Sequence, residues 1–496
     1  MSGRRAWFTV RRRPCIKCVA LGLDRRGWEW GMRVRALKTR LFRATALLLQ
    51  LTAWASGATA QDAEPPYADS CHDPLVGNWK PRADLKDAGV TFCVNYTADA
   101  HGNVSGGIRP GGTYEGRLEV SLDANLETLW SWNGASFHVS ADQIHGRGLS
   151  ANYLGNNILT ANGNEAERAT RLFTLWLQEE NKGTISVKIG QLAADDDFIV
   201  SSNAALFVNS TFGWPGKEAV DLPSGGPVYP LSTPGAEMVV GPKDQGPSFW
   251  LAVFNGDPAG PGPGTPQSRD AGGTSFRLND GAFAIAEFAY RLDGSDRPDG
   301  LKLGGWYHSG RFADQRFDSL GRSLADPTSS HIAARHRGDY GLYAIVDCMI
   351  WPKRCDQEPN DNKQGLEAFL RLGASPSDRN LVDYYADGGL TYAFDDKGMD
   401  AVGLGIAYAR ISDAATGLDR DARFFSGAVR PIRDHELAVE LTYHAQPKAW
   451  PPWLLVQPDL QFILHPGGHV PDPTDPTGRR AIRNAVVIGM RTGVSF

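Results

Sequence analysis

The 496-residue sequence has no apolar run long enough to cross a membrane as an α-helix, and it has almost no helical periodicity. A spanning helix needs about 20 consecutive apolar residues, and the run 44–54 is too short. Only residues 78–88, where Trp79 and Leu85 stand among charged neighbours, predict a short helix. Any membrane-spanning part must therefore be a β-barrel, because no other structure satisfies its backbone in lipid.

Catalytic motifs are missing as well. Neither H-E-x-x-H nor G-x-S-x-G occurs. Glu179 and Glu180 are adjacent, so in a strand they would point to opposite faces and could not act as the carboxylate pair of a glycosidase. The run Asp195-Asp196-Asp197 predicts a charged turn rather than a calcium site, because no further ligand pattern follows it. We therefore expect no enzymatic activity and no metal or cofactor.

The start of the chain is basic and reads as an export signal. A basic region at residues 33–43 precedes the apolar run 44–54 and the small residues Ala58-Thr59-Ala60. This order predicts a leader over residues 1–60 with a secretory signal peptide whose true start is Met32. The leader holds 13 of the 51 basic and 2 of the 56 acidic residues, so the remainder carries a net charge of −16. An exported chain this acidic is not expected to bind nucleic acid.

Cysteine is scarce after the leader, where four residues remain: Cys71, Cys93, Cys348 and Cys355. An exported protein can oxidise them. Cys348 and Cys355 flank a short segment that a disulfide could staple, and Cys71 with Cys93 would tie the N-terminal segment to the first strand. Buried free thiols are the alternative.

The rest of the chain consists mostly of short alternating runs broken by glycine, proline, asparagine and aspartate. In residues 115–126, apolar residues such as Leu118 alternate with charged ones such as Arg117 and Glu119. Residues 484–496 alternate in the same way and end at Phe496. About sixteen such segments predict an all-β fold, namely a transmembrane antiparallel β-barrel of about 16 strands with a short N-terminal helix.

The connections between these segments support the same fold. Residues 394–399 have the composition of a tight turn. Four other connections, rich in glycine and proline, are predicted as long loops: residues 212–234, 255–279, 312–339 and 465–483. Short turns on one side and long loops on the other are typical of outer-membrane barrels. Tyr443, Trp450 and Trp453 gather at a strand end, where an aromatic girdle is expected.

Two C-terminal stretches resemble a known family. They are Trp453-Leu-Leu-Val-Gln-Pro-Asp-Leu-Gln-Phe-Ile-Leu-His-Pro-Gly-Gly468 and Asn484-Ala-Val-Val-Ile-Gly-Met-Arg491, followed by Phe496. They are similar to the carbohydrate-selective porins typified by OprB, and residues 78–90, 175–178 and 190–192 agree. The resemblance implies a sixteen-stranded outer-membrane barrel through which glucose and related sugars diffuse. The sequence departs in the loop 258–266 and in its cysteines, which bears on sugar preference more than on the fold.

The polar face of the predicted strands supplies candidates for the pore lining, because a lumen that admits sugars needs hydrogen-bonding groups and flat apolar faces. The substrate-binding candidates are Arg117, Glu119, Asp123, Trp176, Lys188, Arg371, Gln457, Asp459, Gln461 and Arg491, with Lys302 and Trp250 also on inward positions. Asp459, Gln461 and Arg491 are expected on neighbouring final strands, where they could form one cluster. Trp176 could stack on sugar rings.

The sequence thus predicts a leader over residues 1–60, a short periplasmic segment with a helix over 61–88, and a barrel over 89–496 in the outer membrane of a Gram-negative bacterium. The predicted function is passive passage of mono- or oligosaccharides. A general or structural barrel without sugar selectivity is the alternative. Expected partners are sugars, outer-membrane lipid and the barrel-assembly machinery, which would recognise Phe496. Both a monomer and a homotrimer agree with the sequence.

Overall fold

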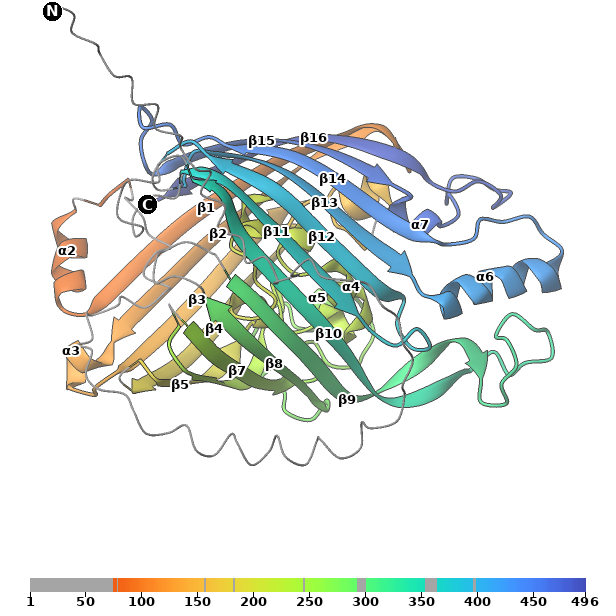
Figure 1. Ribbon diagram of the computed structural model, residues 1–496, viewed down its shortest axis with the longest axis horizontal. Helices are drawn as coiled ribbons and strands as arrows, with labels where there is room; N and C mark the ends of the chain where they lie inside the picture. Colours follow the sequence, from red (N-terminus) through yellow and green to blue (C-terminus); the bar gives the residue numbers. More distant parts are fainter. Residues whose placement is uncertain are drawn as a thin grey trace, which may run out of the picture. The chain divides into compact units, whose positions relative to one another are not determined.

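A computed structural model describes residues 75–77, 79–155, 158–181, 183–243, 246–291, 300–352, 364–395 and 398–496. The leader predicted over residues 1–60 lies outside these residues. The described strands form one closed antiparallel barrel, in which each strand pairs with its neighbours in sequence (Figure 1). The first and last strands close the ring, with Asn95 opposite Ser495. This confirms the predicted sixteen-stranded fold.

The sixteen strands have the following bounds: β1 Val90–Gly107, β2 Gly111–Asn125, β3 Ala135–Gly146, β4 Ala169–Asn181, β5 Ile185–Leu192, β6 Thr233–Val240, β7 Gly246–Asn255, β8 Ala282–Arg291, β9 Gly300–Asp318, β10 Ala333–Pro352, β11 Gly365–Ala374, β12 Val382–Ala393, β13 Ala401–Ile411, β14 His435–His444, β15 Leu454–Leu464 and β16 Arg483–Ser495.

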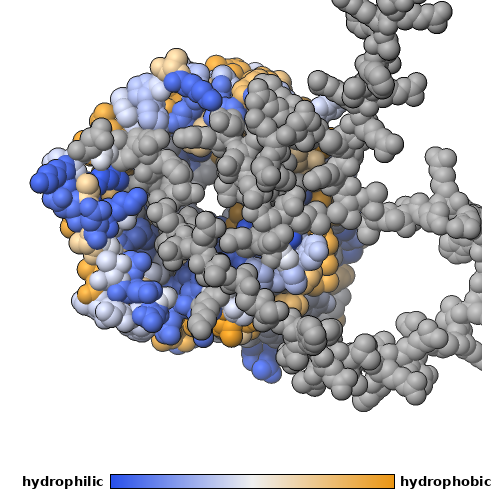
Figure 2. Space-filling view, turned by 60° about the vertical axis from the view of Figure 1, so that its left-hand side comes forward, coloured by the Kyte–Doolittle hydropathy of each residue, from blue (hydrophilic) through white to orange (hydrophobic). Residues whose placement is uncertain are grey.

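Alternation along the strands gives the barrel two faces. In β11, Leu370 is 46% exposed on the outside, whereas the next residue, Arg371, is 2% exposed on the inside. In β14, Leu441 and Glu440 divide in the same way. In Figure 2, which brings the left-hand end of Figure 1 forward, hydrophilic and hydrophobic residues both lie on the visible surface, with small hydrophobic patches around its rim. None of the helices among the described residues is long and apolar enough to span a membrane.

Placing a charge on the outer face should destabilise the barrel. Ile406 is the midpoint of β13 and is 47% exposed on the outside. Ile406→Arg should lower the free energy of unfolding in lipid by about 2–4 kcal/mol, because a cation at the bilayer midplane loses its hydration. Ile332→Arg makes the same change in the β9–β10 connection, where Ile332 is 73% exposed, and should have little effect. Urea unfolding in vesicles measures both. Equal losses in the two variants would contradict the outer-face assignment.

The short N-terminal helix is present as α2, Lys80–Asp87. It begins directly after Trp79, with proline in its first turn, where the missing N–H costs nothing. The Arg82 guanidinium donates to the backbone carbonyl of Phe496 (2.6 Å), and the Phe496 N–H donates to the Val94 carbonyl (2.8 Å). The chain end is thus held between α2 and β1.

A second long helix was not predicted. Helix α6, Asp413–Ser426, lies in the β13–β14 connection, at the end of the barrel opposite α2 (Figure 1). The Ser412 hydroxyl caps its start by accepting from the Ala415 N–H (3.3 Å), and left-handed Gly427 ends it. Its buried residues are the small Ala415, Thr416 and Gly417, which give little hydrophobic signal.

The predicted loop 312–339 was also wrong in part. Strands β9 and β10 continue into it as a long hairpin that leaves only residues 319–332 as the connection. The Arg316 guanidinium on this hairpin forms a two-point ion pair with Asp421 of α6 (2.7 and 2.9 Å). The hairpin and α6 therefore support each other beyond the barrel wall.

The hydrophobic core lies inside the barrel rather than outside it. The β3–β4 connection contributes Leu154 and Leu159, and the β5–β6 connection contributes Phe207 and Phe212. These side chains pack against inward residues of the wall such as Phe369. We call residues 147–155 with 158–168, and residues 193–232, the two infolded loops. They fill much of the lumen, and the passage that remains is set by what they leave open.

The shorter helices lie mostly in the connections and have these bounds: α3 Leu126–Trp130, α4 Gly216–Asp221, α5 Pro266–Arg269 and α7 Pro466–His469, with shorter turns η2 Ser150–Leu154, η3 Ala194–Asp196, η4 Ala204–Leu206, η5 Ser210–Phe212 and η6 Pro223–Gly225.

Candidate functional site: a polar cavity beside the infolded loops

The second infolded loop is fastened to the wall by one buried guanidinium. Arg371 of β11 donates to the backbone carbonyls of Ile199, Thr211 and Gly213 at 2.8–3.1 Å. Its remaining N–H groups reach the carboxylate of Asp387 on β12, with Nε 3.0 Å from Oδ1. One side chain therefore satisfies three loop carbonyls that would otherwise be buried without a donor.

Strands β14 and β15 hold the same loop from another side. The Glu440 carboxylate accepts from the backbone N–H groups of Val208 (2.7 Å) and Asn209 (2.9 Å). Gln461 accepts from the Asn209 side-chain amide (3.0 Å) and donates to the Ala161 carbonyl of the first infolded loop (2.7 Å). These buried contacts join both loops to the wall.

An ion pair across the closure of the barrel faces the first infolded loop. Arg491 of β16 donates to both carboxylate oxygens of Asp99 on β1 (2.8 and 3.2 Å) and to the side-chain oxygen of Asn162 (2.8 Å). The side-chain amide of Asn164 donates to the same Asp99 carboxylate (2.7 Å). The pair therefore positions Asn162 and Asn164 through side-chain contacts alone.

A second cationic group lies on β2. Arg117 donates to Asp142 of β3 (2.8 Å) and lies 3.3 Å from Glu119. Its guanidinium carbon is 4.4 Å from the centre of the Tyr229 ring, which belongs to the second infolded loop. The Tyr229 N–H in turn donates to the carboxylate of Asp195 (3.2 Å). The cation thus stacks on the aromatic face and fixes the ring against the wall.

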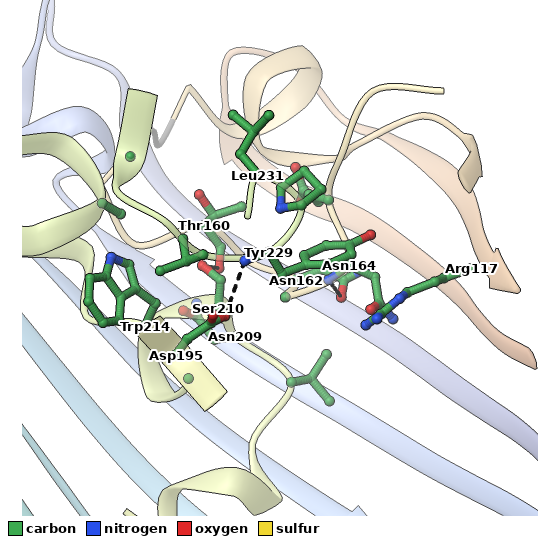
Figure 3. A pocket seen from close by; sticks show the side chains of 18 of the residues that line it. Arg117, Thr160, Asn162, Asn164, Asp195, Asn209, Ser210, Trp214, Tyr229 and Leu231 are labelled. Atoms are coloured by element: carbon green, nitrogen blue, oxygen red, sulfur yellow. Dashed lines mark hydrogen bonds between the residues drawn. The ribbon is translucent and has the colours of Figure 1, made fainter. Parts of the chain in front are cut away.

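Between these groups lies a cavity of about 470 Å³ (Figure 3). In that view Arg117 and Trp214 stand on opposite sides, with Tyr229 between them. Its lining includes Arg117, Thr160, Asn162, Asn164, Glu165, Glu167, Asp195, Phe207, Asn209, Ser210, Trp214, Tyr229, Leu231, Gln267 and Arg491. The volume falls in the range of roughly 300–1,000 Å³ that is usual for small-molecule sites.

Two buried donors in this wall, the Tyr229 hydroxyl and Nε1 of Trp214, have no hydrogen-bond partner among the described residues, and neither has the carboxylate oxygen Oδ1 of Asp195. Burial raises the pKa of Tyr229, so its hydroxyl keeps its proton and can donate. A buried donor without an acceptor is costly. A solute or water that offers an oxygen at this place would remove that cost.

Two carboxyl groups of the loops titrate near neutral pH. Burial raises the pKa of Glu165 to about 7, against the hydrogen bonds that it accepts from Ser150. Burial also raises the pKa of Asp195 to about 6. The cavity therefore gains negative charge as the pH rises from 5 to 8.

This titration predicts a pH dependence of ion selectivity. The pKa of Glu165 is about 7 in the folded protein, whereas its ordinary value is 4.5. The stability that this group contributes therefore falls as the pH rises between these two values. Cation selectivity should rise as the pH passes through about 7, because the deprotonated carboxylate attracts cations. Reversal potentials in a salt gradient from pH 5 to 8.5 measure it. Glu165→Gln should flatten the step near pH 7, and an unchanged step would contradict the assignment.

Comparison with known proteins agrees with this architecture. Residues 109–496 match the family described as "Carbohydrate-selective porin, OprB family". The chain belongs to this family. It is an outer-membrane porin selective for carbohydrates, and its family and fold indicate a channel rather than an enzyme.

Individual relatives span nearly the whole porin. Porin B of Pseudomonas aeruginosa is 25% identical over 482 residues, covering 92% of this chain and 98% of that protein. A putative porin of Acinetobacter baylyi, QuiX, is 24% identical and covers 79% of this chain and 89% of that protein. The high-pH structure of Pseudomonas putida OprB superposes with a TM-score of 0.73 at 21% identity, covering 86% of this chain and 99% of that one, and so shares its fold.

The ten predicted pore-lining residues of the porin divide into two groups. Arg117, Glu119, Asp123 and Arg491 remain partly exposed, and Arg117 and Arg491 line the cavity. The other six are buried: Trp176, Lys188, Arg371, Gln457, Asp459 and Gln461. The predicted cluster of Asp459, Gln461 and Arg491 forms only in part, because Gln461 donates to Asp459 (2.8 Å) while Arg491 pairs with Asp99.

The buried candidates contact protein groups instead of the open lumen. Trp176 stacks on His138 with ring centres 4.9 Å apart, and the Lys188 amine lies 5.3 Å from the centre of the same indole ring. Lys188 also pairs with Asp197 (2.5 Å), so the acidic run 195–197 is a turn that contacts the wall. Gln457 donates to the Leu206 carbonyl (2.7 Å). Residues predicted to meet solute thus hold the infolded loops in place.

The residues that line the cavity from the infolded loops were not predicted from the sequence. Tyr229, Trp214, Asn162 and Asn164 lie in segments without periodicity, so no pattern marked them as inward. The only local signal was compositional, an aromatic residue between prolines at Pro227 and Pro230. Of the cysteines, Cys93 is disulfide-bonded, and Cys71 and Cys355 lie outside the described residues. Both pairings stay predictions.

Proposed function

We propose that this porin passes neutral mono- and oligosaccharides such as glucose by passive diffusion, and that the cavity between Arg117, Tyr229 and Trp214 is the place where a sugar is weakly held. The observation that carries the proposal is the pair of unpartnered donors, the Tyr229 hydroxyl and Trp214 Nε1, in a cavity that the Arg117 guanidinium also lines. Sugar hydroxyls accept from all three groups, and the flat rings suit the apolar face of a pyranose.

The charge pattern favours neutral solutes. The cations that line the cavity, Arg117 and Arg491, are each paired with a carboxylate, so neither presents an uncompensated charge to a passing solute. The Arg117 pair with Asp142 and Glu119 holds its guanidinium in one place. Fixed donors and acceptors without a strong net field lower the barrier for a polyol while still releasing it quickly.

Single-channel conductance in a planar bilayer, with glucose titrated in, tests the proposal on the mature chain, residues 61–496. We expect steady openings that glucose reduces in a saturable way. Tyr229→Phe removes only the hydroxyl and should weaken this block by about 2- to 10-fold, the effect of one hydrogen bond. Tyr290→Phe is the matched control, because Tyr290 is 42% exposed on the outer face of β8.

The other outcomes distinguish the alternatives. Openings that glucose does not affect would indicate a general porin. Correctly folded protein that gives no openings would indicate a structural barrel with a filled lumen. If glucose blocks both tyrosine variants equally strongly, the protein still passes sugar, but Tyr229 is not part of the binding site.

We further propose that Phe496 marks the last strand for the barrel-assembly machinery. Its side chain is 38% exposed, while its backbone is held by Val94 and Arg82. The exposed ring leaves the end of β16 accessible to a protein that recognises the last strand. Phe496→Ser should lower the yield of heat-modifiable protein in the outer membrane without changing refolding of purified protein in detergent.

A further inference from the structure

A cluster of histidines lies on two neighbouring connections at the loop end of the barrel. Asp434 ends the β13–β14 connection, His435 begins β14, and His465 and His469 belong to the β15–β16 connection. We call these four residues the histidine cluster. It is separate from the cavity, and no step of sugar passage uses it.

The side chains of the cluster converge. Nδ1 of His465 lies 2.9 Å from Oδ1 of Asp434, and Nδ1 of His469 lies 3.7 Å from Oδ2 of the same carboxylate. One ligand atom from each of Asp434, His465 and His469 lies within 4.8 Å of the others. His435 adds a third imidazole, with Nδ1 3.5 Å from Asp434 Oδ1 and its ring centre 4.6 Å from that of His465.

Backbone contacts fix the two connections relative to each other. The Asp434 N–H donates to the Gly468 carbonyl (3.1 Å), and the Gly467 N–H donates to the Glu436 carboxylate (2.7 Å). His465 and His469 both have positive φ, 52° and 75°, a conformation that is uncommon for residues other than glycine. These backbone conformations cost energy, and the surrounding contacts keep the two imidazoles together in spite of that cost.

The cluster is open to the medium. The side chains are exposed by 44% for Asp434, 31% for His435, 29% for His465 and 36% for His469. The connections at this end of the barrel include the longest of the described chain, and long loops face the outside of the cell in outer-membrane barrels. An ion outside the cell could reach the cluster without entering the pore.

We propose that Asp434, His465 and His469, with His435 as a neighbouring fourth ligand, bind one transition-metal ion of the Zn²⁺, Cu²⁺ or Ni²⁺ class. Imidazole nitrogens with one carboxylate oxygen suit these ions, whereas Ca²⁺ and Mg²⁺ prefer sites made of oxygen alone. The ion would replace the hydrogen bond between His465 and Asp434 and tie the β13–β14 connection to the β15–β16 connection. This site departs from the expectation that the protein binds no metal.

Calorimetric titration of the folded, tag-free mature chain with ZnCl₂ at pH 7.5 tests the proposal. We expect saturable binding of one ion per chain. His465→Asn and His469→Asn should each weaken it at least tenfold, and asparagine tolerates the left-handed backbone at these positions. His331→Asn is the matched control, because His331 also has positive φ (53°) and is exposed at the same end of the barrel. It should bind as the unaltered protein does.

Folding and metal class are checked in parallel. Heat-modifiable mobility on a gel shows that each variant is folded, and 1 mM Mg²⁺ or Ca²⁺ should not compete with Zn²⁺. Zinc should also raise the melting temperature of the unaltered protein but not that of His465→Asn, because ligand binding stabilises the folded state alone. Absence of saturable zinc binding would overturn the proposal. So would equal affinity in His465→Asn and His331→Asn, whatever the result of the glucose titration.

Discussion

Replacing Arg371 with methionine should loosen the second infolded loop and lower the free energy of unfolding by about 3–5 kcal/mol, the usual cost of removing one partner of a buried ion pair. Arg371 is 2% exposed. Its loss leaves the Asp387 carboxylate without its cation and the carbonyls of Ile199, Thr211 and Gly213 without their donor. Methionine keeps the unbranched apolar stem of the side chain, so the change removes mainly charge and hydrogen bonding.

Two measurements follow this change. Urea unfolding in vesicles gives the stability, and single-channel recording should show higher conductance with more noise, because the loop loses its β11 anchor and is held less tightly. Arg316→Met removes a two-point ion pair of similar geometry outside the barrel, with side chains 33% and 19% exposed. That control should cost less than about 1 kcal/mol and leave conductance unchanged. A quiet channel of normal conductance in Arg371→Met would mean that other contacts fix the loop.

Replacing Arg491 with methionine should make the pore strongly cation-selective. Arg491 lines the cavity and is the partner of Asp99, which is 1% exposed. Removing the guanidinium leaves an unpaired carboxylate in the lumen. A unit charge about 4 Å from a passing ion changes its energy by about 1 kcal/mol in a water-like dielectric. Since cations and anions change in opposite directions, the two shifts add to about 2 kcal/mol, and we expect roughly a thirtyfold rise in the cation-to-anion permeability ratio at low salt.

The reversal potential in a KCl gradient measures this ratio. Arg480→Met is the control. It removes the same charge at a place away from the cavity, because Arg480 is 70% exposed in the β15–β16 connection. The effect of Arg491→Met should shrink in 1 M salt as screening shortens the reach of the carboxylate. A permeability ratio that stays the same in Arg491→Met at low salt would place the ion path elsewhere in the lumen.

The barrel wall could be predicted from sequence because its signal is local. In a strand, each residue points away from its neighbour, so the contrast between Leu370 and Arg371 can be seen in two letters of sequence. Closure followed from the same rule, since an exported chain with many such strands and no spanning helix has no other way to satisfy its backbone in lipid. The outward face of β16, with Ile488 and Met490 exposed, confirms this reasoning.

The cavity could not be predicted in this way. Its shape depends on contacts between residues far apart in the chain, such as Glu440 with Val208 and Arg491 with Asn162. The infolded loops have no repeating pattern, and nothing in their composition states that they enter the lumen. The same polarity that marked Gln461 as inward suits both a pore-lining residue and a loop anchor. Only the three-dimensional structure separates these roles.

The fastening of the infolded loops has a consequence for engineering this porin. The side chains that hold the second infolded loop belong to β11, β14 and β15. The loop and these wall residues therefore have to match one another and cannot be exchanged separately. A loop grafted from a relative with another solute preference would arrive without its partners unless the residues at positions 371, 440 and 457 came with it. Changing the solute preference of this porin by loop exchange therefore requires exchanging these wall residues together with the loop.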